Sequence, residues 1–202
     1  MKHLSWIPNA LTLSRLLLCP IIIFLELNGY YLSGTLLFAL AGYTDYLDGK
    51  LARKYQWETP SGQILDPLCD KLFALIFFTL LLLLDACPNW FLGFFITVAL
   101  FQSFGFMVLK FVRGLSLSQL YPLPMGKINL GIQFLWIGVI LIDIYLRNSF
   151  PRNFHFSPLF YNLGYGLVAT CHLVTFFRYF FYHHTRLIPS PNQSPTSHPE
   201  FA

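Results

Sequence analysis

Long apolar runs recur along almost the whole chain, and they restrict its fold more than any other feature. A hydrocarbon core about 30 Å thick needs about 20 apolar residues in a helix to cross it. Six such runs can be counted, at about residues 9–27, 31–53, 61–85, 90–112, 126–146 and 158–182. Because backbone groups in lipid must find their hydrogen-bond partners within the segment, each run is predicted to be a helix.

The composition agrees with a membrane location. Of the 202 residues, 55% are hydrophobic and only 11% are charged, which is too little polar surface for a water-soluble domain of this length. We therefore expect an all-α integral membrane protein, a six-transmembrane-helix bundle formed by residues 1–188. Residues 189–202 are rich in Pro, Ser and Asn and are predicted to be a disordered tail. No nucleic-acid partner is expected.

The distribution of basic residues predicts the orientation in the membrane. With a cytoplasmic N-terminus, only Arg147 and Arg152 lie on the far side, which satisfies the positive-inside rule. The basic residues on the cytoplasmic side are then Lys2, Arg53, Lys54, Lys110, Arg113, Lys127 and Arg186. We expect a multi-pass protein, of the bacterial inner membrane, with both termini in the cytoplasm. The first run lacks a small-residue cleavage pattern and is expected to remain as a mature helix.

The cysteines and histidines give no indication of a zinc site. Cys19, Cys69, Cys87 and Cys171 fall in different parts of the chain without a C-x-x-C motif, so we expect unpaired, apolar packing residues. His172 is expected to be a packed core histidine.

Four aspartates stand inside or at the ends of apolar runs, where an ionised carboxylate costs at least about 2.5 kcal/mol without compensation. Asp45 and Asp48 are three residues apart, and Asp66 and Asp70 are four apart. Each pair therefore lies on one face of its helix. Two antiparallel helices joined by a short loop can turn both pairs toward each other, at the cytoplasmic side of the membrane.

Four carboxylates without a nearby thiol or imidazole suit hard cations, which favours Mg²⁺ or Mn²⁺ over Zn²⁺. The alternative is a structural network of salt bridges inside a transporter or scaffold. Its cations would be Arg15, Lys50, Arg53 and Lys71.

The residues between the aspartates favour a ligand site. Gly49, Ala52 and Gly62 are small and leave room beside the acidic faces, although close helix packing also favours small residues. Arg53 and Lys71 stand next to the same faces. Their charges could hold a phosphate group whose other oxygens bind the metal ions.

Residues 45–70 read DYLDGKLARKYQWETPSGQILDPLCD, which matches the pattern D-x2-D-G-x2-A-R-x8-G-x3-D-x3-D at every fixed position. This segment resembles the CDP-alcohol phosphotransferase family. The resemblance implies that a CDP-linked donor gives its phosphoryl-linked group to an alcohol and that CMP is released. It also implies a homodimer.

The resemblance further implies roles for individual residues. Two metal ions would be held by Asp45, Asp48 and Asp66, and Asp70 would be the general base, with or without a metal contact of its own. The nucleotide site, at the cytoplasmic end of the helices, would be lined by Gly49, Ala52, Arg53 and Gly62.

Three further segments resemble the phosphatidylglycerophosphate synthase branch of this family. They are residues 8–15, with Asn9 and Thr12; residues 65–71, a form that also resembles eukaryote-type cardiolipin synthases; and residues 126–129 followed by Gln133. This likeness predicts CDP-diacylglycerol as the donor and glycerol 3-phosphate as the acceptor. Asn9 and Thr12 are equally compatible with a donor contact or with a plain helix start.

The acceptor half of the site departs from that branch. Asn129 replaces a usual second lysine, and Gln102-Ser103 stands where an Arg-Glu pair is usual. Lys71, Lys110, Arg113 and Lys127 are candidate contacts to the acceptor phosphate, although each is also an ordinary positive-inside residue. The alternatives are a cardiolipin synthase, an enzyme that uses another alcohol such as serine or inositol phosphate, and a non-catalytic membrane protein.

Overall fold

The computed structural model describes residues 7–55, 62–113, 124–150 and 156–185, and every regular element in these ranges is an α-helix. Side chains are described for residues 15–44, 47, 69–102, 126–150 and 156–178. The helices are α1 (Ile7–Leu27), α2 (Tyr31–Tyr55), α3 (Gly62–Leu83), α4 (Asn89–Arg113), α5 (Pro124–Ser149) and α6 (Pro158–Thr185).

The six helices agree with the six runs predicted from the sequence to within a few residues at each end. Pro124 and Pro158 are the first residues of α5 and α6, a position where proline is favoured because it lacks an N–H that would be unpaired there. Gly29, with a φ of 82°, forms the turn between α1 and α2, because glycine tolerates left-handed backbone. The expectation of a disordered tail at 189–202 lies outside the described residues.

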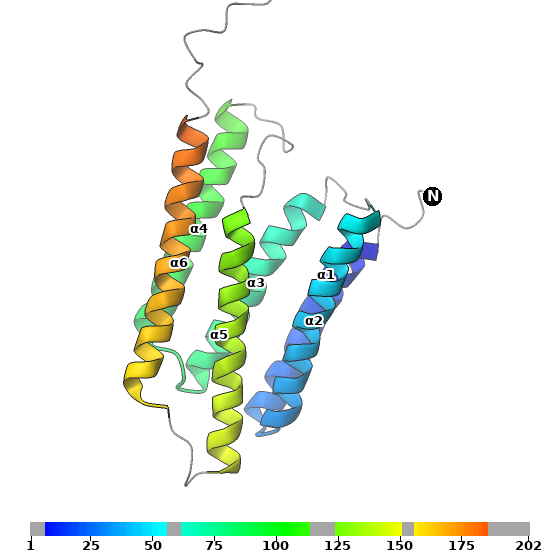
Figure 1. The fold of residues 1–202 in the computed structure, drawn as a ribbon, viewed down its shortest axis with the longest axis vertical. Helices are drawn as coiled ribbons and strands as arrows, with labels where there is room; N and C mark the ends of the chain where they lie inside the picture. The colour runs from blue at the N-terminus through cyan, green and yellow to red at the C-terminus, as the bar shows by residue number, and fades with distance from the viewer. Residues whose placement is uncertain (1–6, 56–61, 114–123, 151–155, 186–202) are drawn as a thin grey trace, which may run out of the picture.

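Helix α5 is the centre of the bundle. It packs against α2, α3 and α6, while α1 packs against α2 and α3, and α4 packs against α3 and α6. Figure 1 shows α1 and α2 on one side of α5, with α4 and α6 on the other. The helices alternate in direction, so that the ends of α2, α4 and α6 lie at the same end of the bundle as the starts of α1, α3 and α5. We call this the motif end.

Aromatic rings fill much of the interior. Phe38 of α2, Phe73 and Phe77 of α3 and Phe134 of α5 form one layer, in which the Phe38 and Phe134 ring centroids are 4.5 Å apart. A second group joins α3, α4, α5 and α6 and consists of Phe78, Phe91, Phe95, Trp136 and Tyr165. Ring pairs at these separations add to the free energy of burial, so the two groups hold all the helices except α1 together.

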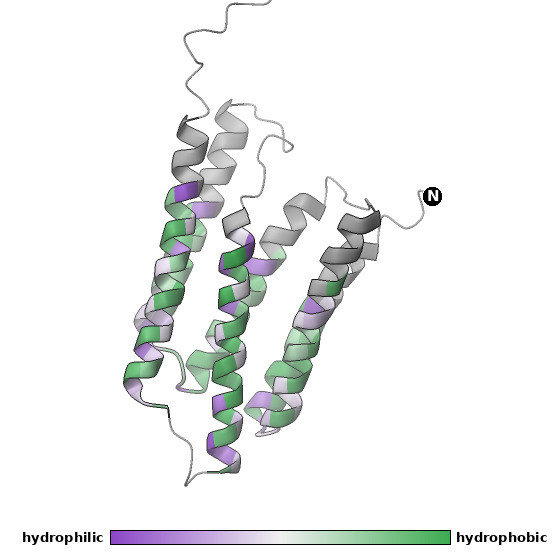
Figure 2. Ribbon diagram, in the orientation of Figure 1, coloured by the Kyte–Doolittle hydropathy of each residue, from purple (hydrophilic) through white to green (hydrophobic). Residues whose placement is uncertain are grey.

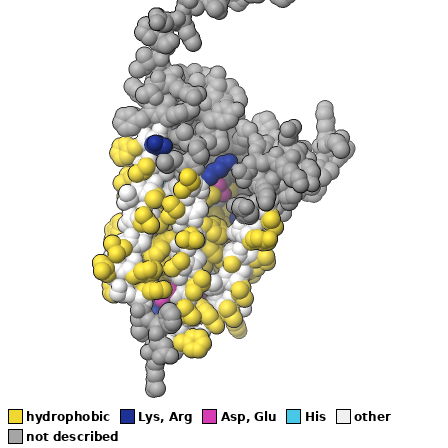
Figure 3. Space-filling view, viewed as in Figure 1, with side chains coloured by type: hydrophobic (Ala, Val, Ile, Leu, Met, Phe, Trp, Pro, Cys, Tyr) yellow, Lys and Arg dark blue, Asp and Glu magenta, His cyan; other side chains and the backbone are white. Residues whose placement is uncertain are grey.

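The outer surface is also apolar. Every helix exposes large hydrophobic side chains, among them Leu17, Leu36, Leu83, Leu100, Leu135 and Leu163, each more than 60% exposed. Figure 2 shows that apolar residues dominate the described helices, and Figure 3 shows apolar side chains over most of the described face. Soluble monomers rarely expose so much continuous apolar surface, whereas lipid would cover it.

Within the described ranges, two segments are long and apolar enough to cross a bilayer, Gly126–Ser149 and Pro158–Arg178. The segment Asn89–Gln102 is apolar but shorter. A membrane protein is therefore supported, and six membrane spans remain a prediction.

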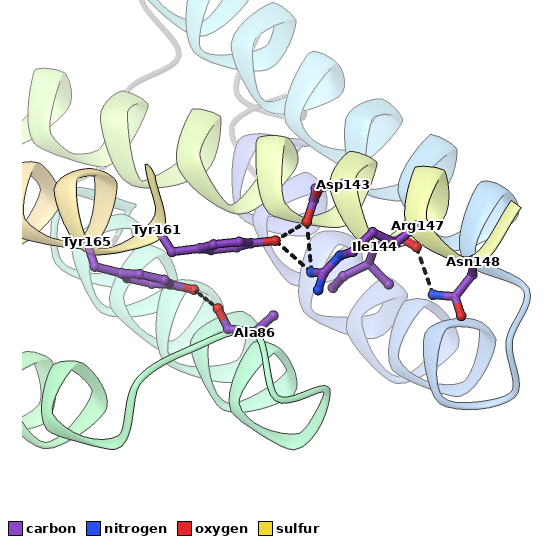
Figure 4. A network of polar contacts seen from close by, with 7 residues as sticks. All are labelled: Ala86, Asp143, Ile144, Arg147, Asn148, Tyr161 and Tyr165. Carbon is purple, nitrogen blue, oxygen red and sulfur yellow. Dashed lines mark hydrogen bonds and ion pairs between the residues drawn. The ribbon is translucent and has the colours of Figure 1, made fainter. Parts of the chain in front are cut away.

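A polar network ties α5 to α6 at the end opposite the motif end (Figure 4). Asp143 is completely buried, and its Oδ2 lies 2.8 Å from Nη2 of Arg147, one turn away in α5. The Tyr161 hydroxyl of α6 donates a hydrogen bond to the same carboxylate and accepts one from Arg147 at 2.6 Å. The carboxylate is thus compensated from both helices, as a buried charge must be.

Candidate functional site

The alternation of the helices brings the predicted site residues to the motif end. The segments that carry the aspartates, the last part of α2 and the first part of α3, both lie there (Figure 1). Asn9 and Thr12 stand in the first turns of α1, Lys110 and Arg113 in the last turn of α4, and Lys127 in the first turn of α5. Positions from five helices are therefore collected at one end of the bundle, as a single site requires.

Of the four aspartates, only Asp70 has a described side chain. Asp45, Asp48 and Asp66 lie within helices, but their side chains are outside the described part of the chain. The prediction that the two pairs face each other is therefore untested. α1 and α5 each pack against both α2 and α3, which places the two motif helices around shared neighbours.

Asp70 is paired with Arg15. The Arg15 guanidinium, in α1, donates from Nη1 to Oδ1 of Asp70 in α3 at 3.3 Å, and the exposed fractions of the two side chains are 9% and 26%. Charge-assisted hydrogen bonds are usually 2.7–2.9 Å long, so this pair is loose. One of the four cations in the salt-bridge alternative, Arg15, thus contacts one of the four motif aspartates, Asp70.

The described side chains do not by themselves form a metal site. Among them, no group of three or more His, Cys, Asp or Glu residues could hold a metal ion, and the side chains of the other three motif aspartates lie outside the described residues. The chemistry of the donor set remains that of oxygen ligands, which fits Mg²⁺ or Mn²⁺.

The aromatic layer lies directly next to the motif residues, on the side away from the motif end. Phe73 follows Asp70 by three residues in α3, and Gly42 precedes Asp45 by three in α2. A Cβ atom on Gly42 would collide with the Phe134 ring, so glycine lets this ring lie against α2. The Phe73 ring stacks on the same Phe134 ring at 5.2 Å. Packing below the motif thus fixes the helices that carry the aspartates.

The residues predicted to line the nucleotide site keep their places on the helices. Gly49, Ala52 and Arg53 are in α2 and Gly62 is the first residue of α3. Their surroundings, and the side chains of Asn9, Thr12, Lys110 and Arg113, lie outside the described part. Among the predicted phosphate contacts with described side chains, Lys127 is exposed and Lys71 is half-buried.

A cluster of neutral polar side chains is an additional feature near this site. Asn129 and Gln133 of α5 and His172 of α6 are 7%, 4% and 3% exposed. The amide nitrogens Nδ2 of Asn129 and Nε2 of Gln133 lie 3.0 and 3.1 Å from Nδ1 of His172. His172 is buried, as predicted, but it is also hydrogen-bonded. One sequence signal points to this cluster, the i, i+4 spacing of two polar residues in an apolar helix, and none points to its partner in α6.

The chain matches a known protein family. The model of the family described as CDP-alcohol phosphatidyltransferase matches residues 5–177.

Individual relatives point to two reactions. Over 182 residues the chain is 30% identical to a Schizosaccharomyces pombe cardiolipin synthase (CMP-forming) / mitochondrial hydrolase fusion protein, with 84% of this chain and 30% of the relative covered. A probable cardiolipin synthase (CMP-forming) of Drosophila melanogaster is 33% identical, with coverages of 69% and 48%. A Bacillus subtilis CDP-diacylglycerol–glycerol-3-phosphate 3-phosphatidyltransferase is 28% identical, with coverages of 72% and 78%. The chain spans less than half the length of the first two relatives.

Proposed function

The chain belongs to the CDP-alcohol phosphatidyltransferase family, and from this premise we propose that it transfers the phosphatidyl group of CDP-diacylglycerol to an alcohol and releases CMP in phospholipid biosynthesis. The observation that carries the proposal is the complete motif over residues 45–70, placed on two helices that reach the same end of an apolar bundle. A purely structural salt-bridge network would need the aspartates but not the fixed Gly49, Ala52 and Gly62.

The reaction needs the acceptor hydroxyl to lose its proton as it attacks. In the proposed step this oxygen forms a bond to the phosphorus that carries the diacylglycerol, the bond from that phosphorus to CMP breaks, and the proton goes to the Asp70 carboxylate. The contact with Arg15, at 3.3 Å, links Asp70 to α1. A carboxylate in contact with a guanidinium at this distance is placed where the acceptor hydroxyl could reach it in the proposed step.

Asp45, Asp48 and Asp66, with or without Asp70, are the residues that would hold Mg²⁺ or Mn²⁺. The bound cations would supply positive charge for the donor diphosphate and for the leaving CMP. Arg53, in α2, is proposed to hold a phosphate oxygen, and the small residues beside it leave space for the nucleotide.

Glycerol 3-phosphate is the first candidate acceptor. Three sequence segments resemble enzymes that use it, although residues 65–71 resemble cardiolipin synthases as well. The Bacillus subtilis relative that is named for this reaction is covered over 78% of its length. In this case Lys127, exposed at the start of α5, and Lys110 and Arg113, at the end of α4, would attract the phosphate.

Phosphatidylglycerol is the second candidate, which would make the product cardiolipin. A specific observation favours it: Asn129 stands where a second lysine is usual, and it is buried against His172. Gln102, at the position of a usual arginine, is also uncharged. A site with fewer cations suits an acceptor without a free phosphate monoester.

The test is CMP release by purified full-length protein with CDP-diacylglycerol, Mg²⁺ or Mn²⁺, and each alcohol in turn. We expect CMP only when a glycerol-containing acceptor is present, loss of CMP release with a chelator, and recovery when the metal is returned. Product from phosphatidylglycerol but not from glycerol 3-phosphate would select the second candidate. Absence of CMP with every alcohol would overturn the proposed function.

A further inference from the structure

The end of the bundle opposite the motif end, which we call the far end, carries an open pocket of about 190 Å³. The α1–α2 turn and the first turn of α2 form one side of the pocket, and the last turn of α5 forms the other. Figure 1 shows the start of α2 and the end of α5 at this end of the bundle. One water molecule occupies about 30 Å³ in the liquid, so the pocket has room for a larger polar group.

Hydroxyl groups dominate the lining of this pocket. Five of the seven residues that line it carry a hydroxyl, and none of the seven is charged. The five are Tyr30, Tyr31 and Ser33 on the α2 side and Tyr145 and Ser149 on the α5 side. Arg147 stands between the last two in the chain, but its guanidinium is bound to Asp143 and to the Tyr161 hydroxyl of α6. A ligand in the pocket therefore meets neutral hydrogen-bonding groups from two helices.

The backbone at the start of α2 adds further donors to the same pocket. The N–H of Gly34 donates to the Tyr30 carbonyl at 3.0 Å, so the N–H groups of the three residues between them have no acceptor within the helix. These three residues, Tyr31, Leu32 and Ser33, all line the pocket. The first turn of α2 contains no acidic residue. The positive end of the helix dipole is thus open to a negative charge in the pocket.

The number of charges that the pocket can balance is small. Without a lining cation, the neutral donors suit a group that has a single negative charge and several acceptor oxygens. A phosphodiester is such a group, whereas a free phosphate is largely a dianion at neutral pH. Its second charge would have no partner among the residues that line the pocket.

The surroundings of the pocket are apolar and exposed. Leu32 lines the pocket and is itself exposed, Leu27 is the exposed last residue of α1, and Phe150 is exposed directly after Ser149. Side chains of this kind suit contact with acyl chains near the surface of a bilayer. The pocket therefore combines donors for a phosphodiester with an apolar rim for the chains that a phospholipid carries.

We propose that this pocket binds the phosphodiester group of a phospholipid in the membrane leaflet at the far end. The phosphate oxygens accept from the N–H groups at the start of α2 and from the hydroxyls of Ser33 and Ser149, while the acyl chains lie against Leu27, Leu32 and Phe150. The bound lipid joins the α1–α2 hairpin to α5 and so stabilises the bundle. This site goes beyond the proposed function and does not rest on it.

The experiment measures thermal unfolding of the full-length protein in detergent. The protein is heated alone, with phosphatidylcholine, with diacylglycerol of the same acyl chains, and with inorganic phosphate. Phosphatidylcholine has the phosphodiester but no head-group hydroxyl, so it is not a candidate acceptor for the proposed reaction. We expect it to raise the unfolding temperature by about 5–10 °C at about 100 times its Kd. Diacylglycerol and inorganic phosphate are expected to leave the temperature nearly unchanged.

The variant is Ser33→Asp, which places a negative charge in the pocket. A carboxylate in the first turn of a helix is favourable, so the variant is expected to fold at least as stably as the wild type while the rise with phosphatidylcholine disappears. Asn89→Asp is the matched control, because Asn89 is the exposed first residue of α4 and does not line the pocket. This control adds the same charge to the start of a helix and is expected to keep the full rise.

Four results would overturn the inference. Phosphatidylcholine may leave the unfolding temperature of the wild type unchanged, or diacylglycerol may raise it equally, which would show a contact with acyl chains alone. An equal rise with inorganic phosphate would identify a free anion as the ligand. A full rise in Ser33→Asp would place the bound lipid elsewhere. CMP release enters none of these measurements, so their failure is distinct from failure of the proposed function.

Discussion

Arg15 in α1 and Asp70 in α3 are in contact across 55 positions of the chain, with 3.3 Å between Nη1 and Oδ1. The pair joins the first helix to the second half of the aspartate motif. It is compatible with a structural salt bridge and with a carboxylate that is held ready for catalysis. These two roles predict different behaviour when the residues are changed.

Asp70→Asn is expected to lower CMP release by at least about 100-fold, because the amide cannot take the proton from the acceptor hydroxyl. The measurement is CMP formation per amount of folded, membrane-inserted protein. Asp85→Asn is the control: Asp85 is exposed in the turn after α3 with a φ of 54°, a conformation that asparagine also tolerates. Normal turnover by Asp70→Asn would refute the assigned role.

The double variant Arg15→Met with Asp70→Asn separates the two roles of the pair. Arg15→Met alone leaves Asp70 without this cation and is expected to lower both stability and turnover. If the pair is only structural, the double variant, which removes both charges, should regain both. We expect the double variant to regain stability but not turnover. Thermal unfolding in detergent measures the first and CMP release measures the second, on the same preparation. Recovery of turnover in the double variant would contradict our interpretation.

Gly42→Val is expected to destabilise the bundle by about 1–3 kcal/mol, the usual cost of overpacking, because a Cβ atom there collides with the Phe134 ring. Thermal unfolding in detergent would measure the change. Gly131→Val is the control in α5, where a Cβ atom meets nothing within 4 Å. Combining Gly42→Val with Phe134→Leu should recover part of the loss; if it does not, the collision is not the cause.

Arg147→Met is expected to cost about 3 kcal/mol of stability, since it leaves the fully buried Asp143 with the Tyr161 hydroxyl as its described partner. Tyr161→Phe should cost less, because the ion pair remains. Unfolding temperatures of the two variants give the comparison, and CMP release per folded molecule should not change. Asn148→Ala is the control. Asn148 is exposed, and its side-chain amide donates a hydrogen bond to the Ile144 carbonyl one turn earlier in α5. Equal losses in all three variants would exclude this account.

The proposed orientation can be tested by labelling single cysteines in a variant without the native ones. Gly126 and Ser149 are exposed near opposite ends of α5. A membrane-impermeant maleimide should label Gly126→Cys only from the cytoplasmic side and Ser149→Cys only from the other side. The reverse pattern would invert the topology, and labelling of both from one side would exclude a membrane span for α5.

The helices could be predicted from the sequence because the apolar runs are long and separated by Pro and Gly. The last run was predicted to end at Tyr182, whereas α6 continues to Thr185, since a helix can extend beyond the hydrocarbon core. The aspartate motif was also readable, because its members are close in sequence and their spacing matches helix geometry.

Contacts between distant segments could not be predicted in the same way. Nothing local in the sequence pairs Asp143 with Tyr161, or Asn129 with His172, because these contacts depend on the rotation of α5 against α6 about their own axes. Arg15 was foreseen only as one of four cations that could reach the aspartates. Its contact with Asp70 depends on packing, since α1 lies against both α2 and α3.

The aromatic layer formed by Phe38, Phe73, Phe77 and Phe134 also separates two charged regions of the bundle. It lies between Asp70 near the motif end and the buried Asp143 nearer the far end. These rings carry no charge. The ion pair of Arg15 with Asp70 and that of Arg147 with Asp143 are therefore kept apart as two local systems, each neutralised within its own end of the bundle.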